Sequence, residues 1–120
     1  MSVKHADDVS AKDVAAGRDT TIQVLISPQE GPNFALRRFS MRKGGDMPLH
    51  TNTVEHEQYV LRGRAKIGIG EETHLVNEGD VVFIPAGVPH YYENLGEEPF
   101  VFLCIIPNLE DRITILGESC

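Results

Sequence analysis

The sequence contains no tryptophan, only two cysteines and fewer basic than acidic side chains. Lysine and arginine together number 11, against 18 aspartates and glutamates, which gives a formal net charge of −7. An acidic chain is repelled by phosphate backbones and anionic lipids, so we expect neither nucleic acid nor a membrane as a partner. No apolar run approaches the roughly 18 residues that a membrane-spanning helix needs.

The two cysteines do not form a disulfide framework. Cys104 lies within an apolar run and Cys120 is the last residue, so we expect no structural bond between them. The first residues also lack the apolar core and the cleavage signature of a signal peptide. Both observations favour a reducing, cytoplasmic location.

The length of 120 residues predicts one domain with its own hydrophobic core. Residues 1–20 are polar, and we expect an N-terminal segment there. It either holds one short helical turn between residues 10 and 16 or simply lies on the surface. Residues 21–116 are expected to form the main domain.

After residue 20 the sequence is a series of short segments bounded by Gly, Pro, Asn or Asp. We expect strands in the segments TIQVLIS, NFALRRFSMRK, PLHTN, HEQYVLRG, RAKIGIG, THLV, DVVFIP, HYYEN, FVFLCII and RITIL. The second of these is expected to end at Gly44-Gly45, before a separate strand in PLHTN. Many short strands at this spacing predict an all-β sandwich or closed barrel without a helix of normal length.

Three histidines and an asparagine form the candidate metal site. His50 and Asn52 are two residues apart on one predicted strand and therefore project from the same face. His56 opens the next strand, and His90 follows the rigid turn PAGVP. If the sheet curls on itself, the three imidazoles can converge, and such a set suits divalent transition metals. The plainer alternative is that they are turn or core histidines without a ligand.

These residues fall into a pattern that resembles the cupin superfamily of small β-barrels. The first cupin signature is Gly, five residues, His-x-His, three or four residues, Glu, six residues, Gly. Gly44, His50 and Gly63 match it, whereas Asn52 replaces the second histidine and His56 replaces the glutamate.

The second cupin signature is Gly, five residues, Pro-x-Gly, two residues, His, three residues, Asn. It is matched in full by Gly79, Pro85, Gly87, His90 and Asn94. The resemblance implies a single-domain cupin of the RmlC-like type, a double-stranded β-helix or jelly-roll barrel. It also implies one divalent transition metal ion, Mn, Fe, Ni or Zn, bound at the four positions His50, Asn52, His56 and His90.

Asn52 is the main departure from the cupin pattern. An amide oxygen is a weaker ligand for a transition metal than an imidazole nitrogen. Three roles stay open for this side chain: a loose ligand, a ligand through water, or a hydrogen-bond partner of the substrate. Replacement of glutamate by His56 retains a good ligand.

Strand alternation and the resemblance together suggest the pocket lining. Gln58 shares a strand face with His56, and Tyr92 shares one with His90. Cys104 is placed toward the cavity because its strand borders the metal site in cupins. Arg38 is a candidate cation for an anionic substrate, with an ion pair at the barrel edge as its alternative.

The function expected from the resemblance is that of a metal-dependent enzyme on a small oxygenated or anionic substrate. Its chemistry would be dioxygenase-like, or that of an isomerase or lyase. The alternative is a non-catalytic cupin module that binds a sugar or another small molecule. Small cupins pair as dimers, so a homodimer is expected, with TIQVLIS and FVFLCII as candidate contact segments.

Overall fold

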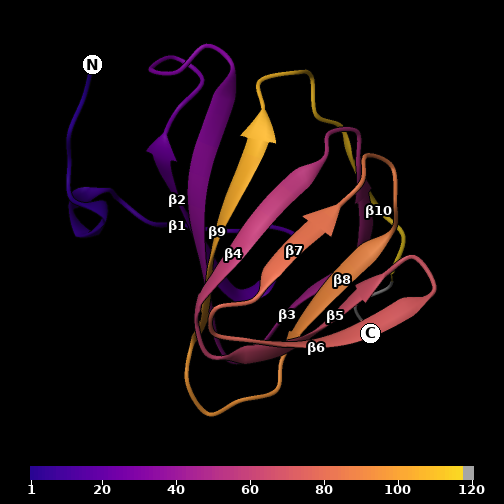
Figure 1. Ribbon diagram of the computed structural model, residues 1–120. Helices are drawn as coiled ribbons and strands as arrows, with labels where there is room; N and C mark the ends of the chain where they lie inside the picture. Colours follow the sequence, from indigo (N-terminus) through magenta and orange to yellow (C-terminus); the bar gives the residue numbers. More distant parts are fainter. Residues whose placement is uncertain (118–120) are drawn as a thin grey trace.

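The computed structural model describes residues 1–117 and consists almost entirely of β-strands (Figure 1). The one helical element described is a 3₁₀ turn, η1, at Ala6–Asp8. The strands are β1 Lys12–Asp13, β2 Arg18–Ile26, β3 Phe34–Asn52, β4 His56–Arg62, β5 Arg64–Ile69, β6 Glu72–Asn77, β7 Val81–Ile84, β8 His90–Asn94, β9 Phe100–Pro107 and β10 Ile113–Ile115. The all-β prediction is therefore confirmed.

The strands form one curled antiparallel sheet with the order β6-β5-β8-β3-β9-β4-β7. β2 and β10 also pair with β3, and β1 pairs with β2. In Figure 1 the strands β4, β7, β8, β5 and β6 lie in front, and β3 passes behind them. Because the sheet curls, residues from distant segments face one another across its interior.

β3 is the element that joins the two halves of the curled sheet. Its first half pairs with β9, and its second half pairs with β8, from Asp46 to His50. The predicted break at Gly44-Gly45 is wrong, because β3 runs unbroken through both glycines. Gly44 adopts a φ of 78°, which glycine adopts at low cost, so the chain bends there without ending the strand.

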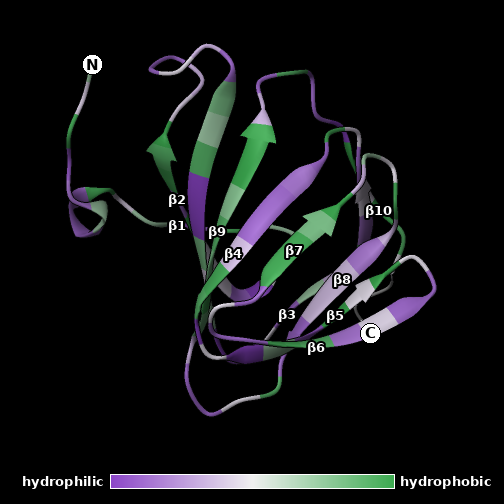
Figure 2. Cartoon of the chain, viewed as in Figure 1, coloured by the Kyte–Doolittle hydropathy of each residue, from purple (hydrophilic) through white to green (hydrophobic). Residues whose placement is uncertain are grey.

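The interior of the curled sheet is apolar. Its buried cluster consists of Met41, Val60, Ala65, Ile67, Val76, Val82, Ile84, Tyr92, Phe100, Phe102 and Cys104. These residues come from alternate positions of the strands, as expected when one face of each strand is buried. In Figure 2 the strand β9 is green along almost its whole length, whereas β4 combines purple and green stretches.

The N-terminal segment is attached to the sheet. Its helical turn is at Ala6–Asp8 and not between residues 10 and 16, where β1 lies instead. β2 begins at Arg18, three residues before the predicted domain start at residue 21. The separation into residues 1–20 and 21–116 stays a prediction, because pairing of β1 with β2 continues the sheet into the segment.

Cys104 is buried and forms no disulfide, and Cys120 lies outside the described residues. Across residues 1–117, no helix has the length and apolar character needed to cross a membrane.

Candidate metal centre

Three strands bring the predicted metal ligands together. His50 and Asn52 lie near the end of β3, His56 begins β4 and His90 begins β8. His50 and His90 are direct cross-strand partners in the pairing of β3 with β8. The side chains of all four residues are buried.

The three imidazole rings are neighbours. The ring centroids of His50 and His90 are 4.2 Å apart, and those of His56 and His90 are 5.5 Å apart. Because Zn–N bonds are only about 2.0–2.1 Å long, two imidazoles that bind one ion have to be close neighbours, as these rings are. His90 lies between the other two rings and is 1% exposed.

Backbone carbonyls fix the orientation of His50 and His90. Nδ1 of His50 lies 2.7 Å from the carbonyl oxygen of Pro48, and Nδ1 of His90 lies 2.9 Å from that of Val88. A carbonyl can only accept, so each Nδ1 carries the proton and each Nε2 keeps its lone pair. This is the hydrogen-bond pattern that orients histidine ligands of metals.

His56 has a different hydrogen-bond environment. Its Nδ1 lies 3.3 Å from Nη2 of Arg37 and 3.3 Å from Sγ of Cys104. A guanidinium only donates, so Nδ1 accepts and Nε2 carries the proton. Nε2 is buried and has no hydrogen-bond partner. His56 therefore presents an N–H to the cavity, and it becomes a ligand only after its proton moves to Nδ1.

Asn52 is oriented by Asp111, a residue that the sequence did not point to. Nδ2 of Asn52 donates to Oδ2 of Asp111 at 3.2 Å, and the backbone N–H of Thr53 donates to Oδ1 at 3.1 Å. Oδ1 of Asn52 is buried without a partner. A buried carbonyl oxygen without a hydrogen bond is costly, so this atom is suited to a ligand.

The donor set fits a divalent transition metal. It consists of the lone pairs of His50 and His90 and the orphaned amide oxygen of Asn52, with His56 as a fourth, conditional donor. Within residues 1–117, no three His, Cys, Asp or Glu side chains are already arranged around a common metal position.

Burial keeps the imidazoles of His56 and His90 neutral. Removal from water lowers the pKa of His90 to about 4. Burial, followed by the nearby positive charge of Arg37, lowers the pKa of His56 to about 3. Metal binding needs unprotonated nitrogen, so these rings do not have to lose a proton to solvent at pH 7.

The cluster faces a small cavity with a volume of about 180 Å³. Its lining consists of Val14, Ala16, Ile22, Arg37, Phe39, Met47, His50, Asn52, His56, Gln58, His90, Tyr92, Phe102, Cys104 and Ile113. A larger groove of about 670 Å³ beside Met47 and Tyr91 contains none of the buried histidines. We therefore assign the chemistry to the smaller cavity.

Three of the predicted pocket residues line this cavity: Gln58, Tyr92 and Cys104. Nε2 of Gln58 donates to the hydroxyl oxygen of Tyr92 at 2.6 Å. Burial raises the pKa of both Tyr92 and Cys104, so the hydroxyl and the thiol stay protonated at neutral pH. The ring of Tyr92 stacks on Phe102 and meets the ring of His90 edge-on.

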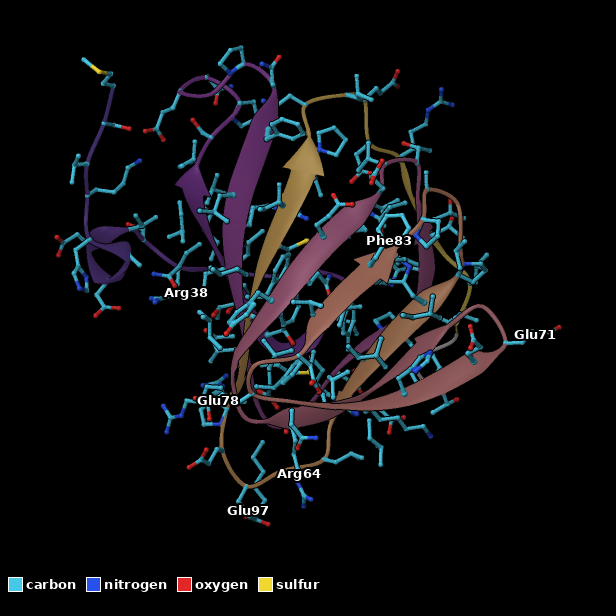
Figure 3. All side chains as sticks on the ribbon, viewed as in Figure 1. Arg38, Arg64, Glu71, Glu78, Phe83 and Glu97 are labelled. Carbon is cyan, nitrogen blue, oxygen red and sulfur yellow. The ribbon has the colours of Figure 1, made fainter. Side chains whose placement is uncertain are left out.

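Arg38 does not line the cavity, which corrects the prediction for this residue. Its Nε donates to Gln23 at 2.7 Å, and its Nη2 forms an ion pair with Asp7 at 3.0 Å. Figure 3 shows Arg38 on the side of the sheet that faces the N-terminal turn. The neighbouring Arg37 points into the cavity instead, because adjacent residues of a strand project to opposite faces.

Comparison with known proteins agrees with this architecture. Residues 37–106 match the cupin domain family, so the chain belongs to the cupins, as the two signatures predicted. The polyketide cyclase RemF from Streptomyces resistomycificus has a very similar structure. It has a TM-score of 0.89 and 30% identity, and the match covers 99% of this chain and 87% of RemF.

Two further relatives carry other activities. The 1-methylthio-D-xylulose 5-phosphate methylsulfurylase of Rhodospirillum rubrum is 30% identical over 102 residues, which is 85% of this chain and 65% of that protein. The oxalate decarboxylase of Lactobacillus farciminis, seen in a formate complex, has a TM-score of 0.77 and 26% identity. That match covers 93% of this chain but only 35% of the decarboxylase.

Proposed function

We propose that this cupin binds one divalent transition metal ion, Mn, Fe, Ni or Zn, in the cavity of the curled sheet. His50, His90 and Asn52 would hold the ion, and His56 would join them once Nδ1 carries its proton. The observation that supports this most directly is the buried, unpartnered Oδ1 of Asn52 beside two imidazoles whose Nδ1 atoms are fixed by carbonyls. Zinc and iron sites commonly combine imidazole nitrogen with an oxygen donor.

The site supports enzymatic chemistry on a small oxygenated substrate, of the isomerase or lyase type. A bound ion would supply Lewis acidity toward a carbonyl or enol oxygen. The N–H of His56 can donate to a substrate oxygen, and the hydroxyl of Tyr92, held by Gln58, can donate to a second one. Phe39, Phe102 and Met47 form an apolar wall that excludes water.

The relatives support the choice of an oxygenated substrate. RemF is a polyketide cyclase, and the methylsulfurylase acts on a sugar phosphate derivative, according to their names. The decarboxylase binds formate. The dioxygenase-like alternative would need a redox-active ion such as Fe or Mn, so the identity of the ion separates the two kinds of chemistry.

A non-catalytic module that binds a small molecule is the second candidate. One observation favours it: within the described residues, no aspartate or glutamate lines the cavity. A carboxylate is a common general base, and its absence leaves the imidazoles as the nearest bases. Under this proposal the metal would fix a ligand oxygen without turnover.

We also propose a homodimer in the cytoplasm. Val24, Ile26 and Ile105 lie on β2 and β9, the two strands that flank the first half of β3, and each is about 40% exposed. Apolar side chains at such positions can be covered in a dimer. Sedimentation of the purified protein would test the assembly. A single species with the mass of one chain, 13.3 kDa, would contradict it.

Elemental analysis of protein purified without added metal tests the metal proposal. We expect one ion per chain in the wild type and none in the double variant His50→Ala/His90→Ala. His74→Ala is the matched control, since His74 is exposed on β6 and should leave the metal content unchanged. Equal metal content in the wild type and the double variant would overturn the proposal.

A further inference from the structure

The guanidinium of Arg37 lies at the cavity without a carboxylate partner. Arg37 is one of the residues that line the cavity, and its Nε is buried with no hydrogen-bond partner. None of the ion pairs found within residues 1–117 includes Arg37. The neighbouring Arg38, in contrast, is paired with Asp7 on the opposite face.

The contacts that Arg37 does make are to neutral groups. Its Nη2 donates to Sγ of Cys104 at 3.1 Å and lies 3.3 Å from Nδ1 of His56. A thiol is only a weak acceptor for the N–H of a guanidinium. The guanidinium also lies over the ring of Phe39, with its Cζ 5.1 Å from the centroid. These contacts leave the positive charge uncompensated.

Arg37 is half-buried, and a charge that loses part of its water is costly unless it is paired or hydrogen-bonded. This chain has 18 acidic residues, yet no Asp or Glu of the described residues lines the cavity. Beside Arg37, the buried N–H of His56 is a second donor without a partner. Two unused donors and one positive charge at one wall of a cavity are features of an anion-binding site.

We infer that the cavity binds a small carboxylate, which Arg37 holds through its guanidinium. This inference rests on the proposed function only for the choice of cavity, since Arg37 binds the anion with or without a metal. A carboxylate matches the planar fork of a guanidinium in two parallel hydrogen bonds. No lysine and no other arginine of the described residues lines the cavity, so one negative charge is balanced and a phosphate dianion is not.

The remainder of the ligand is expected to be apolar and flat. Phe39, Phe102 and Tyr92 supply aromatic walls, and the volume of about 180 Å³ corresponds to roughly six water molecules. A compact body such as a benzene ring fits these conditions. The carboxylate group would lie at Arg37, and the other end of the ligand would lie toward His50 and His90.

The inference is tested by measuring, with calorimetry and NMR, how acetate and benzoate bind to the metal-free protein. Acetamide and benzamide are the neutral controls of the same shape. We expect at least one carboxylate to bind at least tenfold more tightly than its amide, and to shift the Nε–H resonance of Arg37. Arg37→Gln should lose at least tenfold in carboxylate affinity, whereas Arg37→Lys should lose less because it retains the charge.

Arg38→Gln is the matched control. It removes the arginine at the next position of β3, whose side chain lies on the opposite face of the strand. It should bind the carboxylate like the wild type. The inference is wrong if every carboxylate binds no better than its amide, or if Arg37→Gln binds as well as the wild type while remaining folded by circular dichroism. If Arg37→Gln is unfolded, Arg37→Lys replaces it in the test. We then expect Arg37→Lys to bind the carboxylate more weakly than Arg38→Gln, and equal binding by the two variants would contradict the inference.

Failure of this inference can be distinguished from failure of the proposed metal site. Carboxylate binding is measured in a chelator, so it does not depend on the ion. Zinc titration of Arg37→Gln measures the metal site separately, and we expect one ion per chain to be retained.

Discussion

Nη2 of Arg37 lies 3.3 Å from Nδ1 of His56, and this contact distinguishes His56 from the other two histidines of the cluster. His50 and His90 face carbonyl oxygens at Nδ1, which leaves a lone pair at Nε2. His56 faces a donor, so its Nε2 carries a proton. Two histidines are thus prepared for a metal, and the third is prepared to donate a hydrogen bond.

The tautomers of the three rings can be measured directly. In metal-free protein we expect the proton of His56 on Nε2 and the protons of His50 and His90 on Nδ1, as read from ¹⁵N-resolved NMR of the rings. Arg37→Met removes the donor, so the proton of His56 should move to Nδ1 and donate to Sγ of Cys104. A proton on Nδ1 of His56 in the wild type would contradict the assignment.

Asn52→His should raise the affinity for zinc by at least tenfold. Imidazole is a stronger ligand than an amide oxygen, and Asp111 is placed to accept the other ring N–H of the new side chain. Competition with a chromogenic chelator measures the affinity. Asn52→Leu is the control and should bind zinc more weakly than the wild type. Equal affinities in all three proteins would show that residue 52 is not a ligand.

Acid should destabilise the metal-free protein through its buried histidines. The pKa of His90 is about 4 in the folded state, below the ordinary value of 6.5, so the unfolded chain binds more protons between these values. The contribution of neutral His90 to the free energy of unfolding is therefore complete above pH 6.5, and it is lost as the pH falls toward 4. One such group contributes at most about 1.4 kcal/mol per pH unit.

Urea unfolding between pH 7 and pH 4.5 measures this effect. His90→Gln cannot take up the proton, so the free energy of unfolding of the variant should fall less steeply than that of the wild type. His74→Gln is the control on the surface and should follow the wild type. Parallel curves for wild type and His90→Gln would mean that His90 is not held neutral by burial.

Alanine substitutions at Gly63 and Gly79 test the two turns at which these glycines of the cupin signatures lie. Both have positive φ, 82° and 92°, a region that costs residues with a Cβ roughly 1–2 kcal/mol. A Cβ at Gly63 would also press on the carbonyl of Pro99 and lie 3.1 Å from Cα of Phe100, whereas a Cβ at Gly79 would have open space. Gly63→Ala should therefore lower the midpoint of thermal unfolding more than Gly79→Ala. The reverse order would contradict the packing at Gly63.

Sequence reasoning predicted the fold well because the turns carry strong local signals. Gly79, Pro85 and Gly87 bracket β7 and its exit, and the structure places strands and turns at the expected positions there. At the bend of β3 the sequence predicts a break, because two adjacent glycines weaken a strand. Only the register shows that β8 takes over the pairing at Asp46, so the strand continues.

The lining of the cavity was harder to predict. Deciding between Arg37 and Arg38 requires knowing which face of β3 points into the cavity. Leu36 and Ser40 share a face with Arg38, and one is apolar and the other polar, so they do not identify that face. The deciding fact is the pairing of Arg37 with Cys104 across β3 and β9, which joins residues 67 positions apart. Asp111, Val14 and Ile113 reach the site from the two ends of the chain, and no motif marks them.

X-ray absorption spectroscopy of the zinc-loaded protein tests the central claim, that the imidazoles of His50 and His90 bind one ion in the cavity. We expect a first shell of nitrogen and oxygen at about 2.0–2.1 Å, with the outer-shell scattering of at least two imidazoles that His50→Ala/His90→Ala abolishes. A shell without imidazole scattering, or one dominated by sulfur at about 2.3 Å, would contradict the account.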